Sequence, residues 1–467
     1  IRDRSPSRGL GDVYKRQIMD HALKMDDEMT YFPRNTFDQC VDFIVSDCQY
    51  GIDGALPMIY TNASGTVAES LYGRATKAAA YALKARVLLY AASPLFNGNA
   101  DYAKFANEDG TLLFAPKDDS KWGKAAAAAK EAIDKIEGSS YYGLYYSDEP
   151  DNGYRNYMEL FLPSKKWNKE YIFARNQGTG YSDNIHQEKC MAANGMGGWS
   201  GLCPTQELVD AYEMANGSTP IIGYNADGTP IINGASGYSE TGFAATAGKH
   251  YPAGVYNMYV GREPRFYASI NFNGQQWRGR QLEFWQGGKD GINVSKVDYC
   301  CTGYLLRKTA DEGVDVINGK GGMKEASILF RVGSLYLDYA EALNEAEGPV
   351  DDVYKYVDAI RKRAGLPGLA KGLDKDKMRE RIQHERQIEL AFEAGHRYFD
   401  CHRWKIAEKT DNGYMHGMNI TATNKVDYSK RSTVGDSRVF EKKHYLFPIP
   451  QSEMDKRIGL VQSPYWE

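Results

Sequence analysis

The sequence has no long apolar run and no surplus of positive charge. Its most apolar helical stretch, residues 78–92, is interrupted by Lys84 and Arg86, so no transmembrane helix is predicted. The 57 Lys and Arg residues are outnumbered by 61 Asp and Glu residues, which gives a net charge of -4. Proteins that bind nucleic acid need a basic surface for the phosphate backbone, so nucleic acid is not an expected partner.

The motifs of several enzyme classes are also missing. There is no GxSxG nucleophile elbow, no GKS or GKT phosphate loop and no EF-hand loop. His384, His396 and His402 lie near Glu385 and Asp400, but their spacing does not match HExxH, and we interpret them as packed or exposed helix residues. No catalytic residue, metal or cofactor is predicted. A carboxylate pair for glycoside hydrolysis stays open, because such residues can be distant in sequence.

The first 17 residues lack hydrophobic periodicity and are basic, unlike the rest of the chain. Residues 12–17, DVYKRQ, resemble the in-frame translation of a transposon end used in sequencing libraries. We interpret residues 1–17 as an adapter-derived scar, with a genuine disordered N-terminus as the alternative. On this interpretation the gene is truncated at its 5′ end, so a missing signal peptide indicates nothing about compartment. The seven cysteines do not settle the compartment either, because no CxxC pair is present.

Strong helix formers are concentrated near the N-terminus. Residues 74–92 predict a helix that ends before Pro94, and residues 121–137 predict a second helix with Ser120 as its N-cap. Alanine is abundant in both segments. We expect the two helices to pack as one antiparallel pair with alanine at the contact.

The C-terminal third repeats this pattern. Apolar residues at spacings of three and four predict helices over residues 327–346 and 374–394, and a helix between them that is capped by Asp351 and ends at Gly365. A helical pattern resumes after Gly395. Within residues 374–394, Arg381 and Glu385 are expected to form an ion pair one turn apart. The helix pairs indicate tetratricopeptide-like units, although the spacing is not a clean repeat of about 34 residues.

The middle of the chain, residues 139–324, is rich in glycine and aromatic residues. Residues 220–232 predict a hairpin that turns near Asp227-Gly228, and residues 251–291 resemble short strands and loops. The predicted fold is therefore mainly α, with tetratricopeptide-like helix pairs as a scaffold for long loops and a few short strands. We expect one domain over residues 18–467, divided into 18–138, 139–324, 325–410 and a C-terminal tail at 411–467.

The chain contains 34 Tyr, which is more than a core commonly needs. A flat ring can stack on the apolar C–H face of a sugar, while amide and guanidinium groups bind its hydroxyls. The alternative is that the rings pack in the core or hold loops together. Candidate ligand-binding residues, chosen by side-chain type and by position in the loop-rich region, are Trp277, Trp285, Trp199, Tyr256, Tyr259, Tyr299 and Arg278.

Several long segments resemble the SusD/RagB family in family order. The C-terminal segment ERQIELAFEAGHRYFDCHRWK, residues 385–405, is similar to the signature helix of that family. Residues 328–348, 358–369 and 445–454 carry the same resemblance, and so do residues 73–98, 203–217 and 261–274 further upstream. Together these matches extend over most of residues 18–467.

The resemblance implies a nutrient-binding lipoprotein on the outer membrane of Bacteroidota cells, exposed at the cell surface. Such proteins are mostly helical, capture a glycan or sometimes a peptide, and cover a SusC-like TonB-dependent transporter. The family supplies no catalytic residue and no cofactor. Its lipoprotein signal and acylated cysteine are not visible in this sequence, and an early helical segment is missing too.

Three hypotheses follow. The first, which the resemblance favours, is non-catalytic glycan capture and delivery to the transporter. The second is a glycoside hydrolase or another hydrolase on a helical scaffold. The third is a tetratricopeptide-like scaffold that binds only protein. The sequence does not indicate which glycan is bound, because similar aromatic and amide side chains serve many sugars.

Overall fold

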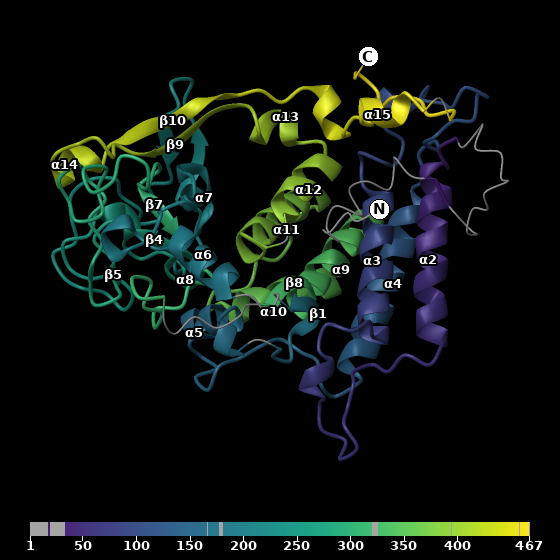
Figure 1. The fold of residues 1–467 in the computed structure, drawn as a ribbon, viewed down its shortest axis with the longest axis horizontal. Coiled ribbons are helices and arrows are strands. Elements are labelled where there is room, and N and C mark those ends of the chain that lie inside the picture. Colours follow the sequence, from purple (N-terminus) through teal and green to yellow (C-terminus); the bar gives the residue numbers. More distant parts are fainter. Residues whose placement is uncertain are drawn as a thin grey trace.

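The computed structural model describes residues 17–18, 33–165, 167–176, 181–319, 326–393, 395–456 and 458–466. The predicted adapter at residues 1–17 lies outside these ranges, except for Gln17. Helices predominate and the strands are short, which confirms the predicted mainly α fold (Figure 1). The helices are α2 Phe37–Asp53, α3 Lys77–Ala92, α4 Ser120–Glu137, α5 Gly153–Leu160, α6 Tyr181–Met191, α7 Gln206–Ala211, α8 Pro264–Ser269, α9 Val332–Glu347, α10 Asp351–Arg363, α11 Lys375–Glu389, α12 His396–Arg403, α13 Ala407–Thr410, α14 Lys425–Tyr428 and α15 Gln451–Met454.

The strands of the described residues form two-stranded antiparallel sheets that join distant parts of the chain or close local hairpins. The pairs are β1 Tyr171–Asn176 with β8 Ala326–Arg331, β2 Ile221–Tyr224 with β3 Pro230–Ile232, β4 Ile270–Phe272 with β7 Tyr304–Leu306, β5 Gln276–Trp277 with β6 Arg280–Gln281, and β9 Gly413–Met418 with β10 Arg431–Arg438. The predicted hairpin over residues 220–232 is confirmed by β2 and β3, and Gly228 has the positive φ of 80° that its turn requires.

The helical frame is built from α2, α3 and α4 together with α9, α10 and α11 (Figure 1). Alanines let α3 and α4 approach closely, and buried residues from both helices share one core with α9 and α10. Thr76 caps α3 by accepting a hydrogen bond from the backbone N–H of Ala79. The predicted packing of these two helices through alanine is confirmed.

Several helix ends differ from the sequence prediction. Helix α3 begins at Lys77 rather than at residue 74. Ser120 is the first residue of α4, with Asp119 at the N-cap, and Asp351 is the first residue of α10, shifts of about one residue that are usual for helix ends. The largest difference is in α11, which ends at Glu389 rather than at residue 394, and Phe392 just beyond it has a positive φ of 63°.

Residues 327–331 were predicted as helix and form strand β8 instead. Ile328 pairs with Ala174, and Ser327 pairs with Arg175 of β1. The pairing partner lies about 150 residues upstream, so tertiary pairing overrides the local helical periodicity. Helix α9 begins directly after the strand, at Val332.

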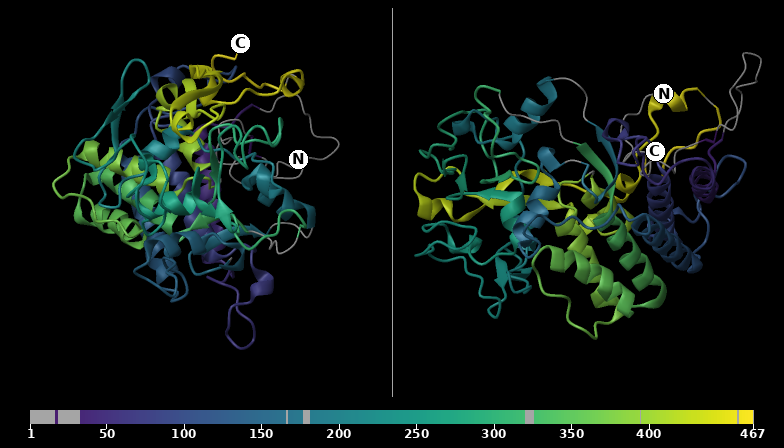
Figure 2. Two further views of the ribbon diagram at one scale, coloured as in Figure 1. Left: turned by 90° about the vertical axis from the view of Figure 1, so that its left-hand side faces the viewer. Right: turned by 90° about the horizontal axis from the view of Figure 1, so that it is seen from below.

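The loop-rich lobe lies at the left in Figure 1 and has an aromatic core of its own. Tyr259, Phe266 and Phe272 stack around one another with ring centroids 4.4–6.2 Å apart. The hairpin of β9 and β10 runs along this lobe, and the chain then returns to the helical frame, where α15 lies (Figures 1 and 2). The Arg34 side chain donates a hydrogen bond to the Val461 carbonyl, so the first and last described segments are in contact.

Candidate functional site

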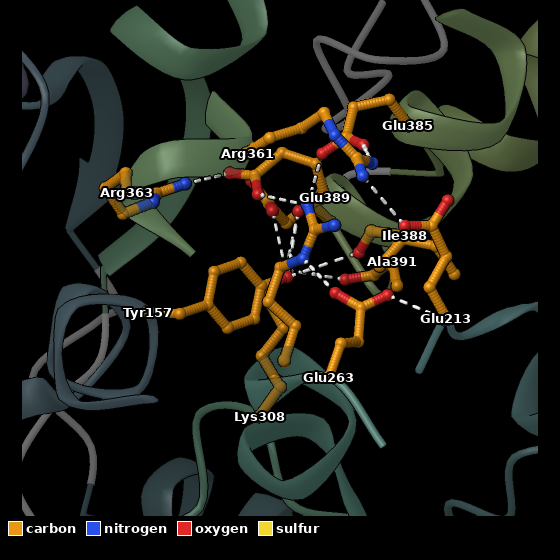
Figure 3. Close-up of polar contacts among 12 residues, drawn as sticks. Tyr157, Glu213, Glu263, Lys308, Arg361, Arg363, Glu385, Ile388, Glu389 and Ala391 are labelled. Atoms are coloured by element: carbon orange, nitrogen blue, oxygen red, sulfur yellow. Dashed lines mark hydrogen bonds and ion pairs between the residues drawn. The ribbon is translucent and has the colours of Figure 1, made fainter. Parts of the chain in front are cut away.

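A buried network of charges joins the helical frame to the loop-rich lobe. Figure 3 shows part of it, with Arg361 beside Glu385 and Arg363 beside Glu389. We call it the central ion network; its cations are Arg265, Lys308, Arg331, Arg361 and Arg363, and its anions are Glu170, Glu213, Glu263, Glu385, Glu389 and Glu393.

Each carboxylate in the central ion network already has a cationic partner. Arg331 contacts Glu170 at 2.7 Å and Glu393 at 2.7 Å, and Arg265 contacts Glu263 at 2.7 Å. Burial alone would raise the pKa of Glu389, but Arg363, Arg331 and Arg265 outweigh it and lower that pKa to about 2. A glycosidase acid needs a raised pKa and access to substrate. Burial raises the pKa of Glu263, but this side chain is fully buried and bound to Arg265, so it lacks that access. We therefore interpret the network as a structural link between the helical frame and the loop-rich lobe.

The expected ion pair between Arg381 and Glu385 was wrong. Glu385 binds Arg265 and Arg361, while Arg381 pairs with Glu213. Both side chains project from α11 toward other elements, so tertiary partners replace the local one. A buried carboxylate gains more from two guanidinium groups in a dry interior than from one exposed neighbour on its own helix.

The three histidines singled out in the sequence lie in helices α11 and α12. His396 and His402 are buried, as the packed interpretation predicted, and the His384 ring forms a 2.7 Å hydrogen bond with the Ala211 carbonyl. Burial, with Arg86 nearby, lowers the pKa of His396 to about 3. Within the described ranges, no group of three or more His, Cys, Asp or Glu side chains is arranged to hold a metal ion.

A cavity of about 360 Å³ opens in the loop-rich lobe. Its walls come from α5, from the loop before residue 253, from the β5 edge and from the residue after β7. The lining combines aromatic rings, amides and cations, the mixture that holds polar ligands with an apolar face. The lining residues are Tyr154, Gly248, Lys249, His250, Tyr251, Pro252, Gln275, Gln276 and Arg307.

A stacked ring pair forms one wall of the cavity. The rings of Tyr154 and His250 lie 4.7 Å apart with an angle of 27° between their planes. Burial, together with Lys249 and Arg307, lowers the pKa of His250 to about 4, so its ring is neutral at pH 7. Burial raises the pKa of Tyr154, which keeps its hydroxyl protonated. The wall therefore presents two neutral rings.

Arg307 holds the ring wall in place. Its guanidinium donates a 2.6 Å hydrogen bond to the Tyr154 hydroxyl and lies 4.7 Å from the centre of the Trp277 ring. The hydrogen-bonding pattern around Gln275 favours the amide orientation in which its oxygen accepts from Arg307. Because the Tyr154 oxygen accepts from Arg307, its own proton is free to bind a ligand acceptor.

Two of the predicted ligand-binding rings are buried, and this corrects the sequence-based choice. Trp277 is 2% exposed and Tyr259 is 1% exposed, and both belong to the aromatic core of the loop-rich lobe. A ring with both faces covered by protein cannot stack on a sugar. The Trp277 ring instead packs against the guanidinium of Arg307, which is a lining residue of the cavity.

The other predicted residues lie outside the cavity lining. Trp199 is 37% exposed and packs beside His186 and Lys189, and Trp285 lies under Lys425. Trp285 is partly buried. Ligand binding at Trp199 and at Trp285 stays a prediction. Tyr256, Tyr299 and Arg278 are partly buried; Tyr256 packs on Phe243, and Arg278 binds Glu188 at 2.8 Å.

Sequence reasoning missed Tyr154, His250 and Arg307. Each is a single polar or aromatic residue in an ordinary local context, and only the fold brings them together from three separate segments. One signal was present: Tyr251 and Gln276 fall inside residues 251–291, the aromatic stretch predicted to form loops of a binding surface.

Comparison with known proteins finds SusD-like proteins both by sequence and by fold. SusD-like protein P25 from Formosa agariphila is 42% identical over 82 residues, which is 17% of this chain and 15% of that protein. SusD-like protein P2 from the same organism is 29% identical over 154 residues, or 31% of this chain and 26% of that protein. The matched segments thus span about a quarter or less of these relatives.

Solved structures match over much more of the chain. BT4246 superposes with a TM-score of 0.79 and 27% identity, covering 96% of this chain and 80% of that one. A SusD-like protein from Bacteroides fragilis, BF3747, gives a TM-score of 0.70 at 27% identity, covering 98% and 78%. Another from that organism, the SusD-like carbohydrate-binding protein BF0978, shares the fold with a TM-score of 0.67 at 21% identity, covering 96% and 76%.

The family assignment also rests on a match across the C-terminal two thirds of the chain. The sequence profile of the SusD family matches residues 163–466, which include the cavity segments at 248–252, 275–276 and 307 and the whole central ion network. With the mainly helical frame and the loop-rich lobe, this match shows that the chain belongs to the SusD family.

Proposed function

We propose that this protein captures a glycan in the cavity beside Tyr154 and His250 and passes it on unaltered. Membership of the SusD family supports glycan binding, and one structural neighbour is a carbohydrate-binding protein. In this proposal the protein is a lipid-anchored component of the outer-membrane surface and delivers the glycan to a SusC-like TonB-dependent transporter. In the described part of the chain, no helix is both long and apolar enough to cross a membrane.

The observation that carries the proposal is the stacked ring pair in a cavity lined with polar groups. The pair gives the C–H side of a sugar ring an apolar wall to pack against. Gln276, which is exposed, and Arg307 are lining residues that can bind hydroxyls. A volume of about 360 Å³ is within the usual range for small-ligand pockets.

Binding to a panel of oligosaccharides, measured by calorimetry, tests the capture step. We expect one glycan class to bind and Tyr154→Ala to weaken that binding about tenfold, since stacking contacts are commonly worth about 1 kcal/mol or more. Tyr50→Ala, at an 83% exposed position on α2, is the matched control and should bind like the wild type. Equal affinity in wild type and Tyr154→Ala would remove the cavity as the site.

Product analysis of the bound glycan separates capture from hydrolysis. After long incubation we expect the oligosaccharide to be recovered at its original length. Shortened products that disappear with a single carboxylate substitution would replace this proposal with a hydrolase. Co-purification with a SusC-like TonB-dependent transporter tests delivery, and association with such a transporter in the absence of any glycan binding would favour the purely protein-binding scaffold.

A further inference from the structure

Two cations line the cavity, and no carboxylate of the described residues forms an ion pair with either of them. Lys249 and Arg307 are both in its lining, and none of the lining residues is acidic. Lys249 is exposed, and Arg307 is partly buried. A ligand in the cavity therefore meets cations from two separate segments.

Arg307 differs from the buried arginines elsewhere in this molecule. Arg331 and Arg363 are bound by glutamates in the central ion network, and Arg262 donates to three backbone carbonyls. Arg307 has only the Tyr154 hydroxyl and the Gln275 amide oxygen as side-chain acceptors among the described residues. A guanidinium carries more N–H donors than these two acceptors occupy, so part of its planar donor edge remains available to a ligand.

The rings next to Arg307 do not substitute for a carboxylate. Its guanidinium lies 4.7 Å from the Trp277 ring centre and 5.5 Å from that of Tyr154, and such contacts orient the cation without cancelling its charge. Glu312 contributes to the raised pKa of Tyr154, and Lys249 contributes to the lowered pKa of Glu149. Neither carboxylate forms an ion pair with Arg307 or Lys249 among the described residues. The lowered pKa of His250 has burial as its first cause and these same two cations as the others.

We propose that the cavity selects an anionic glycan, in which a carboxylate or sulfate group binds Arg307 and Lys249 while the sugar ring packs against the aromatic wall that contains Tyr154 and His250. The donor edge of a guanidinium matches two oxygens of either group, and Lys249 adds a point charge at the rim. This assignment of substrate class rests on the proposed glycan capture.

Matched glycan pairs test the inference in two arms. Galacturonan oligosaccharides and their carboxyl-reduced forms compare carboxylate with hydroxymethyl, and κ-carrageenan oligosaccharides and their desulfated forms compare sulfate with hydroxyl. In at least one arm the anionic form should bind about tenfold more tightly than its neutral match. The arm that shows the preference identifies the anionic group. The preference should shrink as NaCl is raised from about 50 mM to about 500 mM.

Variants that remove one positive charge test which residues cause the preference for the anionic glycan. Arg307→Gln and Lys249→Gln should each lose most of the anionic preference, while Arg307→Lys retains part of it. Lys249 is exposed, so Lys249→Gln is expected to fold normally even where Arg307→Gln does not. Lys104→Gln, which removes one charge at an exposed position outside the cavity, is the matched control and should keep the full preference.

The outcomes separate the two proposals. If a neutral form binds as tightly as its anionic match in both arms, the substrate class is wrong and glycan capture stands. If the anionic preference survives both Arg307→Gln and Lys249→Gln, the anion binds elsewhere and this inference is overturned. If no glycan from these pairs or from a broad neutral panel binds, glycan capture itself fails.

Discussion

At the scale of single residues, Gly248 sets the position of the Tyr251 ring. A Cβ atom at Gly248 would lie 2.4 Å from that ring. Gly248→Ala should therefore push Tyr251 from its place in the cavity lining and weaken glycan binding several-fold, with little change in melting temperature. Titration calorimetry measures the affinity. Gly234→Ala, where the added methyl meets nothing within 4 Å, is the control, and equal affinity for both variants would contradict this role of Tyr251.

Residue-level prediction from the sequence chose side-chain types that also line the cavity, but it could not judge exposure. It pointed to aromatic residues beside amides and arginines in the loop-rich region, and their role in binding stays a prediction. It could not distinguish Trp277, which is covered on both faces, from a ring that borders the cavity such as Tyr154. Burial is decided by segments far away in sequence, as when Arg307 covers the Trp277 ring. Pairs such as Tyr154 and His250 are invisible until the chain folds.

At the scale of secondary structure, the start of α5 is packed against the end of α10. A Cβ atom at Gly153 would lie 2.3 Å from the Ala364 carbonyl, and the backbone on both sides leaves no room to relax. Gly153→Ala should lower the free energy of unfolding by about 2 kcal/mol, a typical overpacking cost. Because Tyr154 is the next residue, glycan binding should weaken as well.

The control for that substitution is Gly123→Ala within α4. A Cβ atom there meets nothing within 4 Å, so alanine should stabilise the helix by up to about 1 kcal/mol. Chemical denaturation measures both variants. A Gly153→Ala protein as stable as the wild type would show that α5 and α10 are not packed this closely.

Elements defined by local signals were predictable and elements defined by distant partners were not. The alanine-rich helices α3 and α4 and the hairpin of β2 and β3 follow from composition and turn residues. Strand β8 does not, because its pairing with β1 is what converts an apparent helix start into a strand. The same holds for Arg381 and Glu385, whose spacing fits a helix pair but whose partners lie on other elements.

At the scale of the whole molecule, the central ion network predicts loss of stability in acid. Burial alone would raise the pKa values of Glu389 and Glu393, but neighbouring cations lower both to about 2, below the ordinary value of 4.5. A depressed carboxyl pKa contributes stability that is fully present above pH 4.5 and is lost as the pH falls toward 2. Melting temperature should therefore fall steeply from pH 4.5 downward.

Two variants show whether the network causes this acid sensitivity. Glu393→Gln should lower stability at pH 7 by about 3 kcal/mol, because it leaves Arg331 and Lys308 partly unpaired, and should flatten the loss below pH 4.5. Glu453→Gln removes a surface ion pair with Lys456 and should change neither quantity noticeably. A wild-type melting temperature that stays constant from pH 5 to pH 3 would contradict the assigned pairing.

In the proposed function, the helical frame and the central ion network support a cavity that holds a glycan without changing it. A crystal structure of the protein with the glycan that it binds most tightly tests this proposal most directly. The proposal predicts a sugar ring packed against Tyr154 and His250 in the cavity, with every glycosidic bond intact. Sugar density outside the cavity, or a cleaved product within it, would contradict the proposal.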